Sequence, residues 1–215
     1  MQTILSTKML SPAQKNLLLN AGIGLVEYNA IKIESLDFRC EDIIQNAIIT
    51  SRNTAKAIIR RNIQIDNVFC VGEKTASLLN ENGYNLLETA DYGKELAVKL
   101  LENYRERVYT FFCGDKRMDD IPLSLKKNNI NFREIEVYRT HLDPKAFDQE
   151  FDGILFFSPS AVQSYIMKNE TSSSVAFCIG TTTAAEAKKY TDNIIIATRP
   201  SIENVLVQVV KKFKV

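Results

Sequence analysis

Short apolar runs alternate with helix-favouring stretches along the whole chain. The first apolar run predicts a strand at residues 3–6, followed by a helix at 13–20 and a longer strand at 25–33. Ser11 and Pro12 come directly before this helix, as expected of an N-cap and of a proline at the first helical position. The N-terminal pattern is therefore β-α-β.

Two further series continue the alternation. The first predicts strands at residues 47–50, 67–71, 85–87, 108–112 and 132–139, with helices at 53–61, 75–82, 94–101 and 119–127 between them. The second predicts strands at residues 153–157, 175–179 and 193–197, and helices at 160–167, 183–189 and 202–213. Strands joined by helices of about ten residues form parallel sheets with right-handed crossovers. We therefore expect an α/β fold of doubly wound parallel sheets.

The last series is too short to make a doubly wound sheet on its own, but the two N-terminal strands would complete it. We therefore expect residues 1–35 and 142–215 to form one discontinuous α/β domain, and residues 36–141 to form a second α/β domain inserted into it. Polar stretches at residues 34–41 and 141–144 are the expected passages between the two domains.

Two stretches of the inserted domain recur later in the chain. Residues 47–55 resemble residues 154–162, and residues 68–76 resemble residues 176–184 at nearly the same offset. This spacing is far too long for a solenoid repeat and indicates two related halves. Each half has a serine turn followed by a glycine turn that contains threonine.

These turns supply the candidate binding residues, because ligands of open α/β sheets bind beyond the carboxyl ends of the strands. The first N–H groups of a helix and the positive end of its dipole favour an anion there. Two facing sets of such turns would enclose a cleft lined with donors, which suits a ligand with many carboxylates or phosphates. The candidates are Ser51, Arg52, Asn53, Gly72, Thr75, Ser158, Ser160, Thr182 and Thr183.

Each of these hydroxyls also has a purely structural interpretation. Taken singly, Ser51, Ser160 and Thr182 are most simply N-caps of helices. Tyr138 lies in a predicted strand, where a tyrosine usually packs half-buried, although its phenol could face the cleft as a proton donor. His141 has no evident Ser or Cys nucleophile to act with.

Composition narrows the classes of partner. Lys and Arg number 27 against 26 Asp and Glu, so no global positive field draws the chain to nucleic acid or to a membrane. The four cysteines are far apart without metal-ligand spacing, and the chain has neither a P-loop nor a GxGxxG motif. The N-terminus is too polar for a signal peptide, and no apolar run approaches the ~20 residues of a membrane span. We expect a cytoplasmic monomer without metal or cofactor.

Six motifs, in order along nearly the whole chain, resemble those of the uroporphyrinogen-III synthase family. They lie at residues 50–55, 71–76, 117–125, 137–140, 156–162 and 179–184. Two positions depart from the family pattern: Thr181 stands where the family usually has proline, and Thr7-Lys8 stands where a Thr-Arg pair is more common.

The resemblance implies two flavodoxin-like domains joined by a two-stranded linker, with the active site in the cleft. It implies that linear hydroxymethylbilane, which carries eight carboxylates, is cyclised to uroporphyrinogen III with inversion of ring D and loss of water, in haem biosynthesis. By this match Tyr138 would donate a proton to the leaving hydroxyl, and Thr75, Thr182 and Thr183 would hold carboxylates. Because the substrate is unstable, we also expect transient contact with the preceding pathway enzyme.

Two other classes of function stay open at this point. One is a non-enzymatic bilobed α/β protein that binds a small polyanionic ligand. The other is a flavodoxin-like carrier of a flavin or nucleotide, although residues 7–11 make a poor phosphate loop after the first strand.

Overall fold

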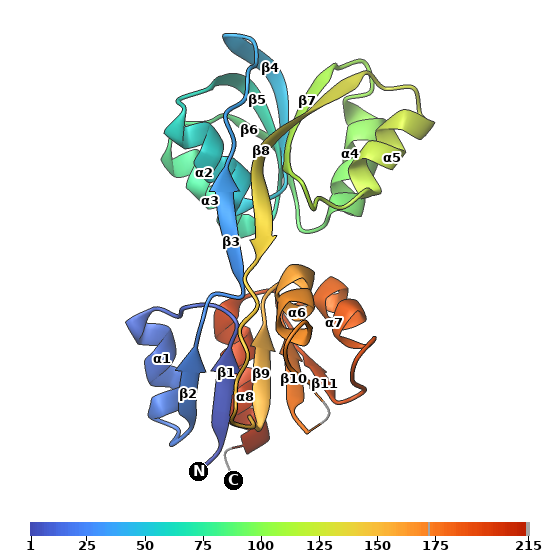
Figure 1. Ribbon diagram of the computed structural model, residues 1–215. Helices are drawn as coiled ribbons and strands as arrows, with labels where there is room; N and C mark the ends of the chain where they lie inside the picture. Colours follow the sequence, from blue (N-terminus) through green and yellow to red (C-terminus); the bar gives the residue numbers. More distant parts are fainter. Residues whose placement is uncertain (172, 214–215) are drawn as a thin grey trace. The chain divides into compact units, whose positions relative to one another are not determined.

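Two sheets organise the computed structural model, which describes residues 1–171 and 173–213 (Figure 1). Unit 1 comprises Met1–Lys32 and His141–Val215, and unit 2 comprises Ile33–Thr140. Each unit is described by itself below.

Unit 1 is a five-stranded parallel sheet with helices on both faces. Its elements are β1 (Thr3–Ser6), α1 (Pro12–Leu19), β2 (Gly24–Glu27), β9 (Gly153–Phe156), α6 (Pro159–Ile166), β10 (Val175–Cys178), α7 (Thr181–Ala187), β11 (Ile194–Ile196) and α8 (Ile202–Phe213). The strand order is β11-β10-β9-β1-β2, and every pair is parallel. Counted along this unit, that is the flavodoxin order 2-1-3-4-5. The N-terminal segment and the C-terminal segment of the chain thus share one sheet.

Unit 2 has a six-stranded sheet. Its elements are β3 (Ile31–Ser35), β4 (Ile43–Ile49), α2 (Arg52–Arg60), β5 (Gln64–Val71), α3 (Glu73–Glu81), β6 (Leu86–Ala90), α4 (Gly93–Asn103), β7 (Tyr109–Gly114), α5 (Asp120–Lys127) and β8 (Phe132–Leu142). The strand order is β3-β8-β7-β4-β5-β6, and the pairs from β4 to β8 are parallel.

The two units have the same spatial order of parallel strands, although the chain enters that order at a different strand in each. Counted from β4, the parallel part of unit 2 runs 3-2-1-4-5; counted with β7 and β8 first, the same strands run 2-1-3-4-5, the flavodoxin order found in unit 1. The difference in chain order lies in the crossovers. Two of them, through α2 and α3, run in one direction before the chain returns through α4 to place β7 beside β4.

Each unit has its core on both faces of its sheet. In unit 1, α6 and α7 cover one face, and α1 and α8 cover the other. In unit 2, α4 and α5 cover one face, and α2 and α3 cover the other. The central strands are buried on both sides, which explains why they read as continuous apolar runs rather than as alternating patterns.

The passages between the units are strands rather than irregular polar segments. β3 crosses the boundary at Lys32 and Ile33, β8 crosses it at Thr140 and His141, and the two strands are neighbours in the sheet. Their arrows point in opposite directions in Figure 1. The two-stranded linker implied by the family resemblance is therefore confirmed.

The strand expected over residues 25–33 is wrong as one piece, because β2 ends at Glu27 and β3 begins at Ile31. Tyr28 turns its ring into the core of unit 1, where it meets Phe147 edge to face at 5.1 Å between ring centroids. Ala30 is fully buried beside it. Burying both side chains bends the backbone between the two strands, and the weak alternation in the sequence did not reveal this bend.

Candidate functional site

The carboxyl ends of both sheets have a point where the strand order reverses, which is where open α/β sheets bind ligands. In unit 2 this point lies between β4 and β7, so Ser51 and Gly114 flank it. In unit 1 it lies between β1 and β9, flanked by Ser6 and Ser158. The two serine turns recognised in the sequence thus occupy corresponding places in their units.

Both serines cap the helices that follow. Ser51 Oγ accepts a hydrogen bond from Thr54 N–H at 3.0 Å at the start of α2, and Ser158 Oγ accepts one from Ala161 N–H at 3.1 Å at the start of α6. The capping interpretation of Ser51 is confirmed. For Ser160 it is wrong, because this residue lies inside α6 with 9% of its surface exposed.

Tyr138 joins the cap of α2 although it comes from a distant strand. Its phenol oxygen lies 3.3 Å from Ser51 Oγ, which in turn lies 2.9 Å from Thr54 Oγ1. β8 is not a neighbour of β4, because β7 lies between them. The phenol therefore reaches across the end of β7, where the last residue is Gly114. Three strand ends meet in this cluster.

The phenol of Tyr138 is held in its protonated form. Burial raises the pKa of Tyr138, hydrogen bonds from the side chains of Ser51 and Asn53 lower it, and the carboxylate of Asp115 raises it further. The net shift is upward from the ordinary value near 10. Near neutral pH this group can donate a proton, and Asn53 belongs to the same cluster.

The glycine turn of unit 2 forms a second feature at the same sheet edge. β5 ends beside β4, and α3 then begins at Gly72, which has a positive φ of 89°. A glycine N-cap has no side chain with which to cap the helix, and its carbonyl accepts from Thr75 N–H and Ala76 N–H at 3.0 Å each. Thr75 itself is only 5% exposed. The N–H groups of Thr75 and Ala76 are therefore bonded within the start of the helix.

Unit 1 has a matching pair of turns. β9 and β10 are neighbours, so the turn at Ser158 and the turn at Gly180 lie next to each other. Thr182 is exposed in the first turn of α7, whereas Thr183 is only 2% exposed. The capping interpretation of Thr182 is wrong, since Gly180 holds the N-cap position. Arg52, in the first turn of α2 in unit 2, is exposed as well.

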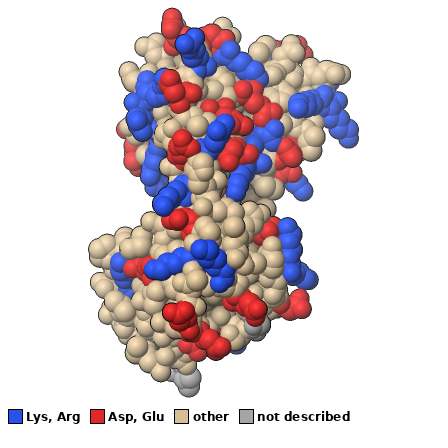
Figure 2. Space-filling view, viewed as in Figure 1, with Lys and Arg blue, Asp and Glu red and all other residues tan. Residues whose placement is uncertain are grey.

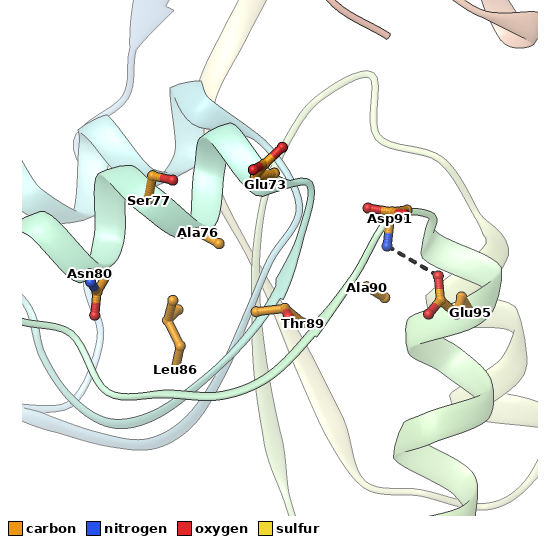
Figure 3. A pocket seen from close by; sticks show the side chains of 9 residues that line it. All are labelled: Glu73, Ala76, Ser77, Asn80, Leu86, Thr89, Ala90, Asp91 and Glu95. Carbon is orange, nitrogen blue, oxygen red and sulfur yellow. Dashed lines mark hydrogen bonds between the residues drawn. The ribbon is translucent and has the colours of Figure 1, made fainter. Parts of the chain in front are cut away.

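The larger of the two main cavities lies away from Tyr138. It has a volume of about 490 Å³ and lies between α3, β6 and the start of α4 (Figure 3). Three of its lining side chains are carboxylates, which would repel a polycarboxylate ligand. The lining residues are Glu73, Ala76, Ser77, Asn80, Leu86, Thr89, Ala90, Asp91 and Glu95.

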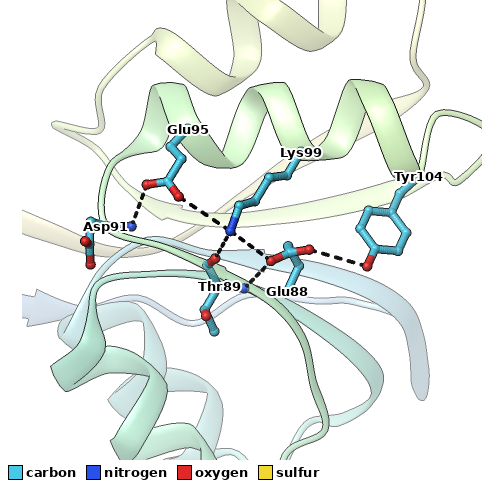
Figure 4. A network of polar contacts seen from close by, with 6 residues as sticks. All are labelled: Glu88, Thr89, Asp91, Glu95, Lys99 and Tyr104. Atoms are coloured by element: carbon cyan, nitrogen blue, oxygen red, sulfur yellow. Dashed lines mark hydrogen bonds and ion pairs between the residues drawn. The ribbon is translucent and has the colours of Figure 1, made fainter.

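One wall of this cavity belongs to a structural network. Lys99 Nζ on α4 lies 3.1 Å from Glu88 Oε1, 3.5 Å from Glu95 Oε1 and 2.8 Å from the carbonyl of Thr89 (Figure 4). Its hydrogen bond to Glu88 is the largest cause of the raised pKa of Lys99. The network fastens α4 to β6, so these carboxylates serve the fold.

The second cavity, of about 360 Å³, adjoins the segment that follows β3. Arg61 lines it, but its guanidinium is already engaged: it pairs with Asp37 at 2.8 Å, donates to the carbonyl of Phe38 at 2.9 Å and lies 4.4 Å from the ring centroid of Phe38. Arg60 also lines this cavity and adds a second guanidinium to its wall.

Charged side chains of both signs are mixed on the surface of unit 2 that Figure 2 shows, with Lys and Arg among Asp and Glu, in keeping with a net charge of +1. Within residues 1–171 and 173–213, no group of three His, Cys, Asp or Glu side chains could hold a metal ion. No helix among the residues described is long and apolar enough to cross a membrane.

Sequence reasoning missed two residues of the Tyr138 cluster. Thr54 joins it through its hydroxyl, and Gly114 provides the surface over which the phenol lies. The signal for Gly114 was present, since it ends an apolar strand and precedes a polar turn. Only the register between β7 and β8 places it opposite Tyr138.

Comparison with known proteins gives one consistent family. The chain matches the family described as "Uroporphyrinogen-III synthase HemD" over residues 13–206. It is 28% identical over 216 residues to "Porphyrin biosynthesis protein HemD" of Ruminiclostridium josui, covering 86% of this chain. The match spans only 43% of that relative's length.

Two solved structures share the fold. Uroporphyrinogen-III synthetase from Helicobacter pylori has a TM-score of 0.72 at 17% identity, with 99% of this chain and 100% of that chain covered. A mutant uroporphyrinogen III synthase from Thermus thermophilus has a TM-score of 0.71 at 13% identity, with 99% and 98% covered. At these identities the likeness concerns the two-domain α/β fold.

Proposed function

Because the chain belongs to the uroporphyrinogen-III synthase family, we propose that it is a lyase that cyclises hydroxymethylbilane to uroporphyrinogen III. The reaction inverts ring D and releases water, and it belongs to porphyrin biosynthesis. The substrate class is a linear tetrapyrrole with many carboxylates.

The reaction requires few chemical steps in which the protein itself takes part. The hydroxyl on ring A leaves with help from the pyrrole nitrogen, which gives an azafulvene-type cation. Ring D attacks this cation to form a spiro intermediate, which fragments and closes again in the inverted sense. Folding the substrate into the reactive shape is the main task, and this is catalysis by proximity. No electrons are transferred overall, so the reaction requires no redox cofactor.

The observation that carries the proposal is the phenol of Tyr138 at the switch point of unit 2. It lies 3.3 Å from Ser51 Oγ and has a raised pKa, so it is protonated near neutral pH. Tyr138 would donate this proton to the departing hydroxyl, which leaves as water. Ser51 and Asn53 would then stabilise the phenolate through the hydrogen bonds that already lower its pKa.

The remaining candidates would bind carboxylates. Arg52 and Thr182 are exposed and can contact them through their side chains. The turn at Gly72 would contribute backbone N–H groups at the start of α3. At Ser158, Pro159 has no N–H and the N–H of Ala161 is bonded to Ser158 Oγ, so the donor there would be Ser160 N–H. Ser160 and Thr183 are buried, so their proposed part is to shape the first turns of α6 and α7.

We also infer a cytoplasmic protein. Cys40, Cys70, Cys113 and Cys178 are all free thiols, and the last three are buried in strands, as is usual for a reducing compartment. An unstable substrate favours direct transfer from the preceding enzyme, and such contact would be transient.

The test is to supply enzymatically prepared hydroxymethylbilane and to separate the type I and type III products. Spontaneous closure gives only type I, so the proposal predicts type III product in proportion to the protein added. Type I alone, at the rate without protein, would refute the synthase activity. Saturable binding of hydroxymethylbilane without type III product would instead favour a binding protein.

A further inference from the structure

We propose that Gly114 and Asp115 are positioning residues that hold the phenol of Tyr138 against Ser51. This inference rests on the proposed function, in which that phenol donates the proton. It begins with an irregularity in the sheet. Cys113 pairs with Glu136, but the next residue, Gly114, pairs with Tyr138, so β8 contains one extra residue, Val137.

The bulge changes the direction of the tyrosine. In a regular strand, Val137 and Tyr138 would point to opposite faces of the sheet. Here both pack against the core cluster that includes Ile49 and Phe112. Bulges often reorient a side chain beside a functional site. In this strand the reoriented side chain is the proposed proton donor.

Gly114 supplies the space for the ring. A Cβ atom at this position would lie 2.3 Å from Cζ, 2.5 Å from Cε2 and 2.7 Å from the phenol oxygen of Tyr138. The phenol must pass over the end of β7 to reach Ser51 on the far side, and only glycine leaves that path open. Any other residue would push the ring away from its partner.

Asp115 fixes the backbone on both sides of the ring. Its N–H donates to the carbonyl of Tyr138 at 3.3 Å, and its Oδ1 accepts from Thr140 N–H at 2.9 Å. These two bonds hold the end of β8 against the turn that follows β7. Asp115 thus preserves the bulge that points the phenol toward Ser51.

The first arm of the test needs no substrate. Tyrosine labelled with ¹³C at Cζ reports each phenol by NMR, and Tyr138→Phe identifies the Tyr138 signal. Burial is the largest cause of the raised pKa, so Gly114→Ala is expected to bring the pKa of Tyr138 back toward 10. Because the Asp115 carboxylate also raises this pKa, Asp115→Ala is compared with Asp115→Asn, which removes the same charge, and Asp115→Ala is expected to have the lower pKa of the two. The matched control is Gly93→Ala, where a Cβ would meet only Ile121 and Asp120 at 3.8–3.9 Å.

The second arm measures formation of type III product in a double-mutant cycle. Gly114→Ala is expected to lower kcat about tenfold, because small displacements of a catalytic group are costly. In the Tyr138→Phe background the same change is expected to have no further effect. Asp115→Asn keeps an oxygen acceptor for Thr140 N–H and is expected to retain most of the rate that Asp115→Ala loses.

Two results would overturn the proposal. One is an unchanged pKa of Tyr138 in Gly114→Ala together with equal pKa values of Tyr138 in Asp115→Ala and Asp115→Asn. The other is an equal loss of rate in the wild-type and Tyr138→Phe backgrounds, which would mark a general structural effect. If Gly114→Ala does not fold, the comparison of Asp115→Ala with Asp115→Asn decides by the same two measurements. The NMR arm stands even if the wild-type protein makes no type III product, so the two proposals fail separately.

Discussion

At the scale of single residues, the chemistry of Tyr138 comes from its neighbours. Burial raises its pKa, and Ser51 and Asn53 partly offset this effect. These groups come from β8 and from the start of α2, which are far apart in sequence. Tyr138, the proton donor of the proposed function, thus stands at the end of a chain of hydroxyls that runs through Ser51 to Thr54.

Replacing Tyr138 with phenylalanine is expected to slow type III formation about tenfold without abolishing it. The ring and its packing remain, and the substrate is still folded by the other groups, but proton donation to the leaving hydroxyl is lost. Steady-state kinetics should show the change mainly in kcat rather than in KM. A rate equal to that of the wild type would remove Tyr138 from the mechanism.

Gly153 tests packing at the residue scale in unit 1. A Cβ here would lie 2.7 Å from Cε2 of Phe177 and 3.0 Å from Cδ1 of Ile4, inside a fully buried strand. Gly153→Ala is therefore expected to destabilise the protein by about 1–3 kcal/mol through overpacking.

Urea denaturation measures this loss. Gly180→Ala is the matched control, because a Cβ there would meet nothing within 4 Å and the backbone is extended. Equal stabilities for the two variants would show that the core around Phe177 relaxes freely.

At the scale of elements, the start of α1 is specified by its own sequence. Ser11 Oγ accepts from Gln14 N–H at 3.3 Å, Gln14 Oε1 accepts from Ser11 N–H at 2.9 Å, and Pro12 follows the cap. Ser11→Ala is expected to cost about 1 kcal/mol of unfolding free energy. Ser11→Asp should keep most of the wild-type stability, because aspartate also caps helices well. Chemical denaturation would compare the two variants. A full loss in Ser11→Asp would mean that the cap is not the cause.

Local signals of this kind explain why most elements could be predicted. Caps at Ser11 and Ser51 and apolar runs such as β9 and β10 are encoded within a few residues, and the structure has them at the expected places. The cap of α6 is Ser158, two residues before the expected Ser160. The break at Tyr28 and the bulge at Val137 depend on partners far along the chain. The strand order of unit 2 likewise depends on crossover directions that no local pattern encodes.

The candidate site likewise has one part that the sequence reveals and one part that it does not. The turns at Ser51 and Gly72 could be recognised because each joins a strand to a helix and recurs in the other half. The Tyr138 cluster could not be recognised from the sequence, because its geometry depends on three strand ends and on the absence of a side chain at Gly114.

At the scale of the whole molecule, buried thiols and phenols make the stability of the protein fall as the pH rises in the alkaline range. Burial raises the pKa of Cys70, Cys178, Tyr109 and Tyr165 to about 12, and that of Cys113 to about 11. The unfolded chain loses these protons first, near pH 9 for thiols and near pH 10 for phenols. Between those values and the folded pKa, the unfolded state binds fewer protons, so stability falls as pH rises.

Below about pH 9 these thiols and phenols are expected to leave the thermal unfolding midpoint unchanged. Above that pH the midpoint should fall steadily toward pH 12. Scans in reducing buffer across this range would measure it. Cys70→Ala with Cys178→Ala lowers stability at neutral pH but should flatten the alkaline slope. A slope identical to that of the wild type would contradict the assignment to these thiols.

The insertion of unit 2 between β2 and β9 has a consequence for the order of events during translation. β1 is a central strand of its sheet, yet its neighbour β9 begins only at Gly153, after every strand of unit 2 has been made. On the ribosome, therefore, unit 2 can close while β1, which is synthesised before it, still lacks its hydrogen bonds to β9. A nascent chain halted near residue 150 would expose this edge of β1 to chaperones.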